Sequence, residues 1–232
     1  MKLEELLRNL SYGELSNLAI GNEGAGYISD NNIPKLVMYT NQSLAALYTR
    51  FILKQSELVL RSFDHIVFYY LRPEFAESSS LPAHTKYIMD SKLEPFKGDL
   101  IRVLQVFNEG GKQLPLNDNE QFAAVFTPQF DCIQLTHPVT GDVFSVLYQA
   151  NHPTLNDEDL SQEIRIPFFL EEALQAHVAY KVFSHMAGAD NSAKSAEHLQ
   201  RYENICIDVV EKDLVHTSVS NTNIKAYKWG WE

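Results

Sequence analysis

The stretch that decides the fold is "PFFLEEALQAHVAYKVFSHMAG", residues 167–188. Pro167 stands where a helix can begin, because the missing N–H of proline costs nothing in a first helical turn. We expect Gly188 to end this helix through a left-handed cap. After the link "ADNS", a second helix is expected from about Ala193 to Val215. Because the link is short, the sequence predicts an antiparallel helical hairpin.

Apolar residues at helical spacing mark the inner face of this second helix and a further helix near the start of the chain. In the second helix of the hairpin they are Ala196, Leu199, Tyr202, Cys206 and Val209. A long helix over residues 33–53 has a buried face of Ile33, Val37, Leu44, Leu47, Tyr48 and Phe51. Before it, a short helix is indicated by Leu3, Leu6, Leu7 and Leu10.

Between the helices the sequence has the composition of β-strands. "FDHIVFYYL", residues 63–71, is rich in aromatic and β-branched residues, which suit a pleated surface. Residues 96–150 are expected to be nearly all strand, with a hairpin turn at residues 108–111 and more strands around "PVTGD", residues 138–142.

The expected fold is therefore α+β. It consists of an antiparallel helical bundle, made of the long helix and the C-terminal helix hairpin, with a β-rich insertion between the helices and an extended C-terminal tail. The expected domains are a discontinuous helical bundle of residues 1–62 and 163–215, a β-rich insertion of residues 63–162, and a tail of residues 216–232.

Charge and composition exclude several classes of protein. Of 232 residues, 30 are acidic and 19 are basic, which gives a formal net charge of −11. This balance argues against sequence-independent binding of nucleic acid, which depends on lysines and arginines that replace counterions. No apolar run approaches the ~20 residues of a membrane helix, and the opening "MKLEELLRNLSYGEL" has glutamates where a signal peptide would be apolar. We expect a cytoplasmic product that does not enter a membrane.

The glycine run "AIGNEGAG", residues 19–26, resembles a phosphate-binding loop only at first sight. Its order, G-x-x-G-x-G, differs from the dinucleotide fingerprint, and it lacks the lysine of a P-loop. Glu23 would also place a negative charge where an anion should bind. We interpret the run as a flexible connector, with Gly21, Gly24 and Gly26 as a hinge.

Other groups of chemically active residues are too far apart for an obvious site. His177 and His185 on one helix are separated by about 80° around its axis and about 12 Å along it, although His198 could approach from the partner helix. Cys132 and His137 would be about 16 Å apart in an extended chain. We therefore expect no catalytic, metal-binding or cofactor-binding residues.

Two further features have the residue types of binding sites, and we interpret both as ordinary structure. Asp157, Glu158 and Asp159 lack the spaced ligands of a calcium loop, and the two cysteines, Cys132 and Cys206, lack the spacing of a zinc site or a disulfide framework. The alternatives left open are a cysteine- or metal-dependent hydrolase, and a module that binds a small ligand under the β region.

The last stretch, "HTSVSNTNIKAYKWGWE", residues 216–232, has Tyr227, Trp229 and Trp231 at alternating positions. Aromatic residues of this kind are enriched at the centres of interfaces. We expect these three residues and Ile224 to bind a partner. Folding of the tail onto its own domain is the alternative.

Two stretches of the chain resemble the head-to-tail connector (adaptor) proteins of tailed bacteriophages, of the short-tailed kind. The resemblance depends on packing patterns in the long helix and in the helical hairpin. The matching positions are Pro34, Leu44, Leu47, Tyr48, Phe51, Pro167, Ala173, Leu174, Val178, Ala179, Tyr180, Lys181, Tyr202 and Glu203. The chain departs from the family in the excursion "AESSSLPAHTKYIMDSKLEP", residues 76–95.

The resemblance implies a structural protein of the virion that is not an enzyme and needs no cofactor. Such a protein assembles in the host cytoplasm as a homo-oligomeric ring, often of twelve copies. The ring lies beneath the portal protein, which the C-terminal segment commonly contacts, and its other face meets tail or nozzle proteins. DNA passes through the channel during ejection without specific binding.

Overall fold

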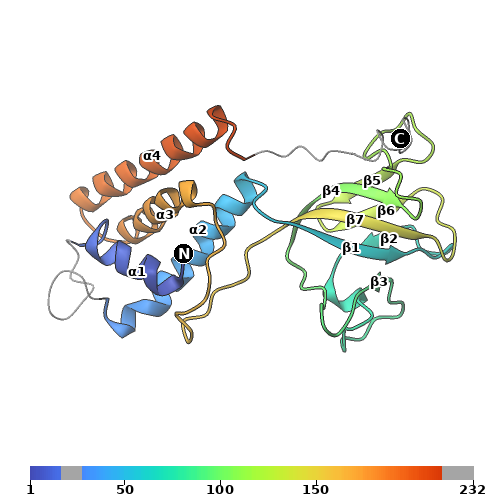
Figure 1. Cartoon of the computed structure of the whole chain (residues 1–232), viewed down its shortest axis with the longest axis horizontal. Helices are drawn as coiled ribbons and strands as arrows, with labels where there is room; N and C mark the ends of the chain where they lie inside the picture. Colours follow the sequence, from blue (N-terminus) through green and yellow to red (C-terminus); the bar gives the residue numbers. More distant parts are fainter. Residues whose placement is uncertain (17–27, 216–232) are drawn as a thin grey trace, which may run out of the picture.

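The structure is a computed structural model, and it describes residues 1–16 and 28–215. These residues form two units that lie side by side (Figure 1). The helical unit contains α1 (Leu3–Tyr12), α2 (Ile33–Arg50), α3 (Glu171–Ser184) and α4 (Ala189–Glu211). The β unit contains β1 (Gln55–Arg61), β2 (Phe68–Tyr70), β3 (Ile88–Met89), β4 (Leu100–Asn108), β5 (Val125–Gln129), β6 (Cys132–Leu135) and β7 (Val143–Ala150).

Helix α3 is the centre of the helical unit. Its sequence is apolar almost all the way round, so that it can bury several faces at once. Its fully buried residues include Ala173, Leu174, Ala176, Val178 and Ala179. Helix α4 packs along one side of α3, α2 packs on another side, and α1 also contacts α3.

The α+β class is confirmed, but the expected antiparallel bundle with a β-rich insertion is wrong. The helices surround α3 instead of forming a bundle from the long helix and a hairpin, because α3 has apolar residues for more than one neighbour. The β residues form two separate antiparallel sheets with a core of their own. None of the helices in residues 1–16 and 28–215 is long and apolar enough to cross a membrane.

The helical hairpin exists with different boundaries. Helix α3 ends at Ser184, and Gly188 stands at the start of α4 with a φ of +119°. Gly188 therefore does not cap α3 as expected. Helix α4 begins at Ala189, and not near Ala193, because the link "ADNS" is itself helical. Tyr202, Cys206 and Val209 face the core as predicted, whereas Ala196 is exposed.

The first sheet has the strand order β3–β1–β7–β4, and the second has the order β2–β6–β5. All strand pairs are antiparallel. Strand β1 pairs with β7 without interruption, from Gln55 opposite Gln149 to Arg61 opposite Val143. The predicted turn after β4 is present, since the Gly111 N–H donates to the Asn108 carbonyl at 2.9 Å.

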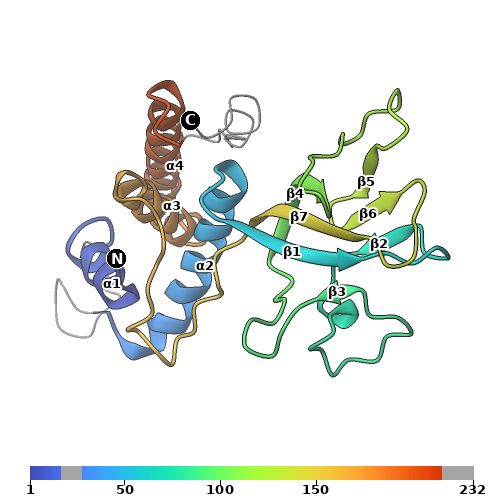
Figure 2. The same cartoon turned by 45° about the vertical axis from the view of Figure 1, so that its right-hand side comes forward.

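Strands β1 and β7 connect the two units, as both views show (Figures 1 and 2). The junction is held by the fully buried side chain of Gln149, at the end of β7. Its amide group donates to the carbonyl oxygens of Tyr48 and, at 3.0 Å, of Phe51. Because these carbonyls lie at the end of α2, one side chain fixes the end of the helix to the sheet.

Candidate functional site

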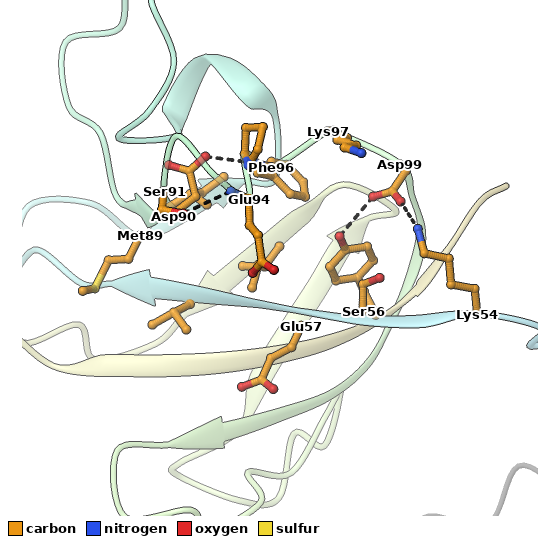
Figure 3. Close-up of a pocket in the computed structure, with 15 residues that line it drawn as sticks. Lys54, Ser56, Glu57, Met89, Asp90, Ser91, Glu94, Phe96, Lys97 and Asp99 are labelled. Atoms are coloured by element: carbon orange, nitrogen blue, oxygen red, sulfur yellow. Dashed lines mark hydrogen bonds and ion pairs between the residues drawn. The ribbon is translucent and has the colours of Figure 1, made fainter. Parts of the chain in front are cut away.

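A groove of about 590 Å³ lies between β1 and the loop of residues 90–99, which joins β3 to β4. Figure 3 shows this loop above the strand, with the Glu94 side chain reaching down toward β1. The inner part of the groove is apolar, where Leu58 and Tyr148 are buried and the Phe96 ring lies edge-on to Tyr148 at 6.1 Å. The groove thus combines an apolar floor with a charged rim.

One end of the groove is closed by a network around Asp99. The Lys54 ammonium group lies 2.7 Å from Asp99 Oδ2, and the Tyr148 hydroxyl donates to Asp99 Oδ1 at 3.0 Å (Figure 3). Burial raises the pKa of Tyr148, and the nearby negative charge of Asp99 raises it further. Tyr148 therefore stays protonated at neutral pH and acts as a hydrogen-bond donor.

The other end is shaped by Asp90, directly after β3. Its carboxylate accepts the backbone N–H of Ser78 at 2.7 Å, the Ser78 hydroxyl at 2.5 Å and the backbone N–H of Phe96 at 2.9 Å. Burial opposes the charge on Asp90, but these hydrogen bonds outweigh it and the pKa of Asp90 lies below its ordinary value. Asp90 thereby holds the loop in its arched form.

Replacing Asp90 with alanine is expected to reduce the free energy of unfolding by about 1–3 kcal/mol, because two backbone N–H groups lose their acceptor. Urea unfolding followed by circular dichroism measures this loss. The matched control is Asp157→Ala, since Asp157 is exposed and belongs to no described hydrogen bond. Equal stability of the two variants would show that Asp90 does not hold the loop.

The rim of the groove has an excess of negative charge. Four carboxylates line the groove, from Glu57, Asp90, Glu94 and Asp99, against the two ammonium groups of Lys54 and Lys97. Asp99 is neutralised by Lys54, whereas Glu57 and Glu94 are exposed. Small-molecule sites of similar volume are mostly apolar with few polar groups. The charged rim therefore suits an extended chain with a basic side chain better than a compact apolar ligand.

The Cys132 and His137 pair of the hydrolase alternative does not form a unit. Cys132 is buried in β6, where burial, with the charge of Asp131 added, raises the pKa of its thiol. The His137 ring stacks instead on Phe122 at 4.3 Å. No described hydrogen bond or ring contact joins the cysteine to the histidine. A nucleophilic cysteine needs a lowered pKa and an adjacent base.

The three helical histidines also contact different neighbours. His177 Nδ1 lies 2.8 Å from the Ser43 hydroxyl, the His185 ring stacks on Tyr39, and the His198 ring stacks on Phe183. His198 also lies 3.3 Å from Glu14, which itself pairs with Arg201. Burial lowers the pKa of His198, so at neutral pH the contact with Glu14 involves an uncharged ring.

No group of three or more histidine, cysteine, aspartate or glutamate side chains in residues 1–16 and 28–215 is placed to hold a metal ion. In the acidic run, Asp159 accepts the N–H and hydroxyl of Ser161 within its own turn. The predicted hinge residues Gly21, Gly24 and Gly26, and the predicted partner-binding residues Ile224, Tyr227, Trp229 and Trp231, lie outside the described residues.

The groove was not predicted from the sequence. Lys54 and Asp99 are 45 positions apart and meet only because β1 and the start of β4 flank β7. The sequence of β1, QSELVLR, has no strict alternation, since Leu58, Val59 and Leu60 are consecutive apolar residues. The period of two that is typical of a half-buried strand is present only in the burial of its side chains.

Comparison with known proteins gives no further assignment. A scan against protein-family models found no match, and no curated protein matches the chain significantly. The resemblance to phage adaptor proteins therefore stays a prediction from the quoted residues.

Proposed function

We propose that this chain is a structural protein of a virion, without enzymatic activity. It acts as a head-to-tail adaptor, a ring between the portal and the tail through which DNA passes. The observation that carries the proposal is an apolar stripe at the C-terminal end of α4. It consists of Ile207 and Val210 on α4 and of Leu214 just beyond the end of the helix, and these residues are 46%, 62% and 43% exposed.

The stripe lies on the outside of the helical unit. Figure 1 shows α4 at the upper edge of this unit, with α3 below it. Val209 is buried and lies about 160° around the helix from Ile207, so Ile207 faces away from the core. Apolar side chains gathered on an outer helix face are typical of an interaction surface. The occupant that we propose is a neighbouring copy of the same chain.

A closed ring requires a heterologous interface, in which each copy contributes two different surfaces. The α4 stripe would be one surface, and a separate face of the next copy would cover it. The resemblance to adaptor proteins supports the ring, as does the net charge of −11. An acidic protein around a channel would let DNA pass, because it offers few cations to its phosphates.

Val210→Asp is expected to break the ring and to leave the folded subunit intact, because a carboxylate cannot be buried without a partner. Mass photometry of the full chain, alone and mixed with its portal protein, measures the size of the assembly. Val139→Asp is the matched control, since Val139 is exposed to a similar extent, 57%, in the β unit.

A wild-type chain that stays monomeric, both alone and with the portal, would contradict the adaptor proposal. Rings formed equally well by the wild type and both variants would show that the stripe is not the interface. Thermal unfolding of the same samples reports whether Val210→Asp has changed the fold.

A further inference from the structure

Strand β1 has an open edge that faces the groove. On its other side it pairs with β7 over its whole length, but β3 pairs only with Val59 and Leu60. The N–H of Arg61 donates toward the β3 side, to the Tyr87 carbonyl at 2.9 Å, whereas the Lys54 carbonyl accepts on the β7 side.

Backbone groups alternate between the two sides along a strand in an antiparallel sheet. The N–H and C=O groups of Gln55 and Glu57 therefore point to the same side as those of Arg61, which is the side of β3, and Glu57 also lines the groove. No described residue forms a hydrogen bond with these backbone groups. Unpaired strand edges of this kind are templates for another strand.

The groove continues the line of β3. After Met89 the chain turns away from β1, because the carboxylate of Asp90 holds the loop to Ser78 and Phe96. The space beside Ser56, Glu57 and Leu58 is left between the strand and this loop (Figure 3). Addition of an extended chain to a sheet edge is a recurrent mode of peptide recognition, in which the backbone gives affinity and alternate side chains give specificity.

The direction in which a further strand would pair with β1 follows from the rest of the sheet. All pairs in this sheet are antiparallel, and antiparallel pairing is slightly more stable per residue than parallel pairing. Val215, the last described residue, and Ile52 line the same hollow, so Val215 lies close to the start of β1. A segment extended straight on from Val215 would reach Gln55 first and would have to pair with β1 in the parallel direction. The tail of a second copy can approach β1 from either end, so it can pair with β1 in the antiparallel direction.

The C-terminal sequence has charges that complement the rim. Residues 222–231, "TNIKAYKWGW", include Lys225 and Lys228, which lie on opposite faces of an extended chain because they are three positions apart. Glu57 and Glu94 are both exposed, one beyond the strand and the other on the loop above the groove. One lysine can therefore face each carboxylate. These ten residues lie outside the described part of the chain.

We propose that the open edge of β1 in one copy receives residues 222–231 of a second copy as a fifth, antiparallel strand. The added strand forms hydrogen bonds with the backbone of Gln55 and Glu57, and its lysines pair with Glu57 and Glu94. This inference rests on the proposed function, because it requires contact between copies in the ring.

Disulfide trapping tests the inference in the full-length protein. One preparation has Glu57→Cys, and a second has a cysteine at the tail position, Lys225→Cys or Lys228→Cys. The native Cys132 and Cys206 are buried, so the new thiols are the accessible ones. After mixing and mild oxidation, we expect a disulfide-linked dimer between the two preparations. Glu158→Cys, at an exposed site in another loop, replaces Glu57→Cys as the matched control and should give no dimer.

Mass photometry of the same mixtures separates this inference from the adaptor proposal. Intact rings without a disulfide-linked dimer specific to Glu57→Cys would contradict the added strand but would be consistent with the adaptor proposal. A further variant combines Glu57→Cys and Lys228→Cys in one chain. If its disulfide forms only within that chain, the strand is added by the chain's own tail, and the inference of a strand from a second copy is overturned. Chains that form no ring would overturn both proposals.

Hydrogen exchange gives an independent measurement on the backbone. In the assembled wild type, the amides of Gln55 and Glu57 are expected to exchange more slowly than in the full-length variant Lys225→Glu/Lys228→Glu, by roughly tenfold or more. The variant Lys35→Glu/Lys194→Glu has the same change of charge on the helical unit and is the control, with no expected loss of protection. Equal exchange in all three proteins would contradict the added strand.

Discussion

Phe183→Ala is expected to lower the free energy of unfolding of the helical unit by about 3–5 kcal/mol, the range for large aromatic truncations in a core. Phe183 lies on α3 and is only 2% exposed. Its ring stacks on His198 of α4 at 5.3 Å, and the Lys194 ammonium group lies over it at 5.5 Å. The substitution therefore leaves a cavity between α3 and α4, which pack along each other.

Urea unfolding followed by circular dichroism at the helical signal measures the loss. Phe168→Ala is the matched control, because Phe168 is 82% exposed and the same atoms are removed. Surface substitutions of this kind change stability by about 0.5 kcal/mol or less. Similar losses in the two variants would contradict the central position of α3.

Because the chain has two separate cores, the effect of Phe183→Ala is expected to be specific to the helical unit. The helical unit and the β unit each have their own cluster of buried residues, and two cores in one chain can unfold in separate steps. Phe183→Ala is expected to weaken the step in which the helices unfold. Any step that belongs to the β unit should change less.

The helices could be predicted because their signal is local. Leu3, Leu6, Leu7 and Leu10 recur at the spacing of one helix face, and all four are buried in α1. The arrangement of the helices could not be predicted in the same way. It depends on α3, which has apolar residues on several of its faces, and the sequence does not show which helix packs on which face.

The candidate site was missed because its parts come from distant positions. Asp90 follows β3, Glu94 lies on the loop, and Lys54 precedes β1. Strand β1 itself follows the long helix after only four residues, and the predicted helix, residues 33–53, extends over most of this link. The open edge beside Gln55 exists because β3 is only two residues long, a fact of strand pairing that no local pattern reveals.

His177→Gln is expected to make the stability of the helical unit less sensitive to acid. His177 lies on α3 and is 7% exposed, and its Nδ1 is 2.8 Å from the Ser43 hydroxyl. The single hydroxyl proton of Ser43 is donated to the Tyr39 carbonyl at 2.8 Å. Ser43 must therefore accept the Nδ1 proton of an uncharged imidazole.

The pKa of His177 is lowered from 6.5 to about 4, mainly by burial and in part by the charge of Lys181, while the charge of Glu203 opposes the change. Above pH 6.5 the ring is uncharged in both the folded and the unfolded chain, so its stabilising effect is fully present. As the pH falls from 6.5 toward 4, only the unfolded chain gains the proton, and stability is lost. The total loss is about 3 kcal/mol, at 1.36 kcal/mol for each pKa unit.

The measurement is urea unfolding of wild type and His177→Gln at pH 7 and pH 5. Glutamine keeps a donor for Ser43 but cannot be protonated, so the variant should lose about 2 kcal/mol less than wild type over this interval. The burial of His152 and His198 also lowers their pKa values, but both residues are present in both proteins and their effects cancel in the difference. His84→Gln, in an exposed loop of the β unit, is the matched control and should behave as wild type. If His177→Gln and wild type lose the same stability between pH 7 and pH 5, the imidazole of His177 is not held uncharged by the core.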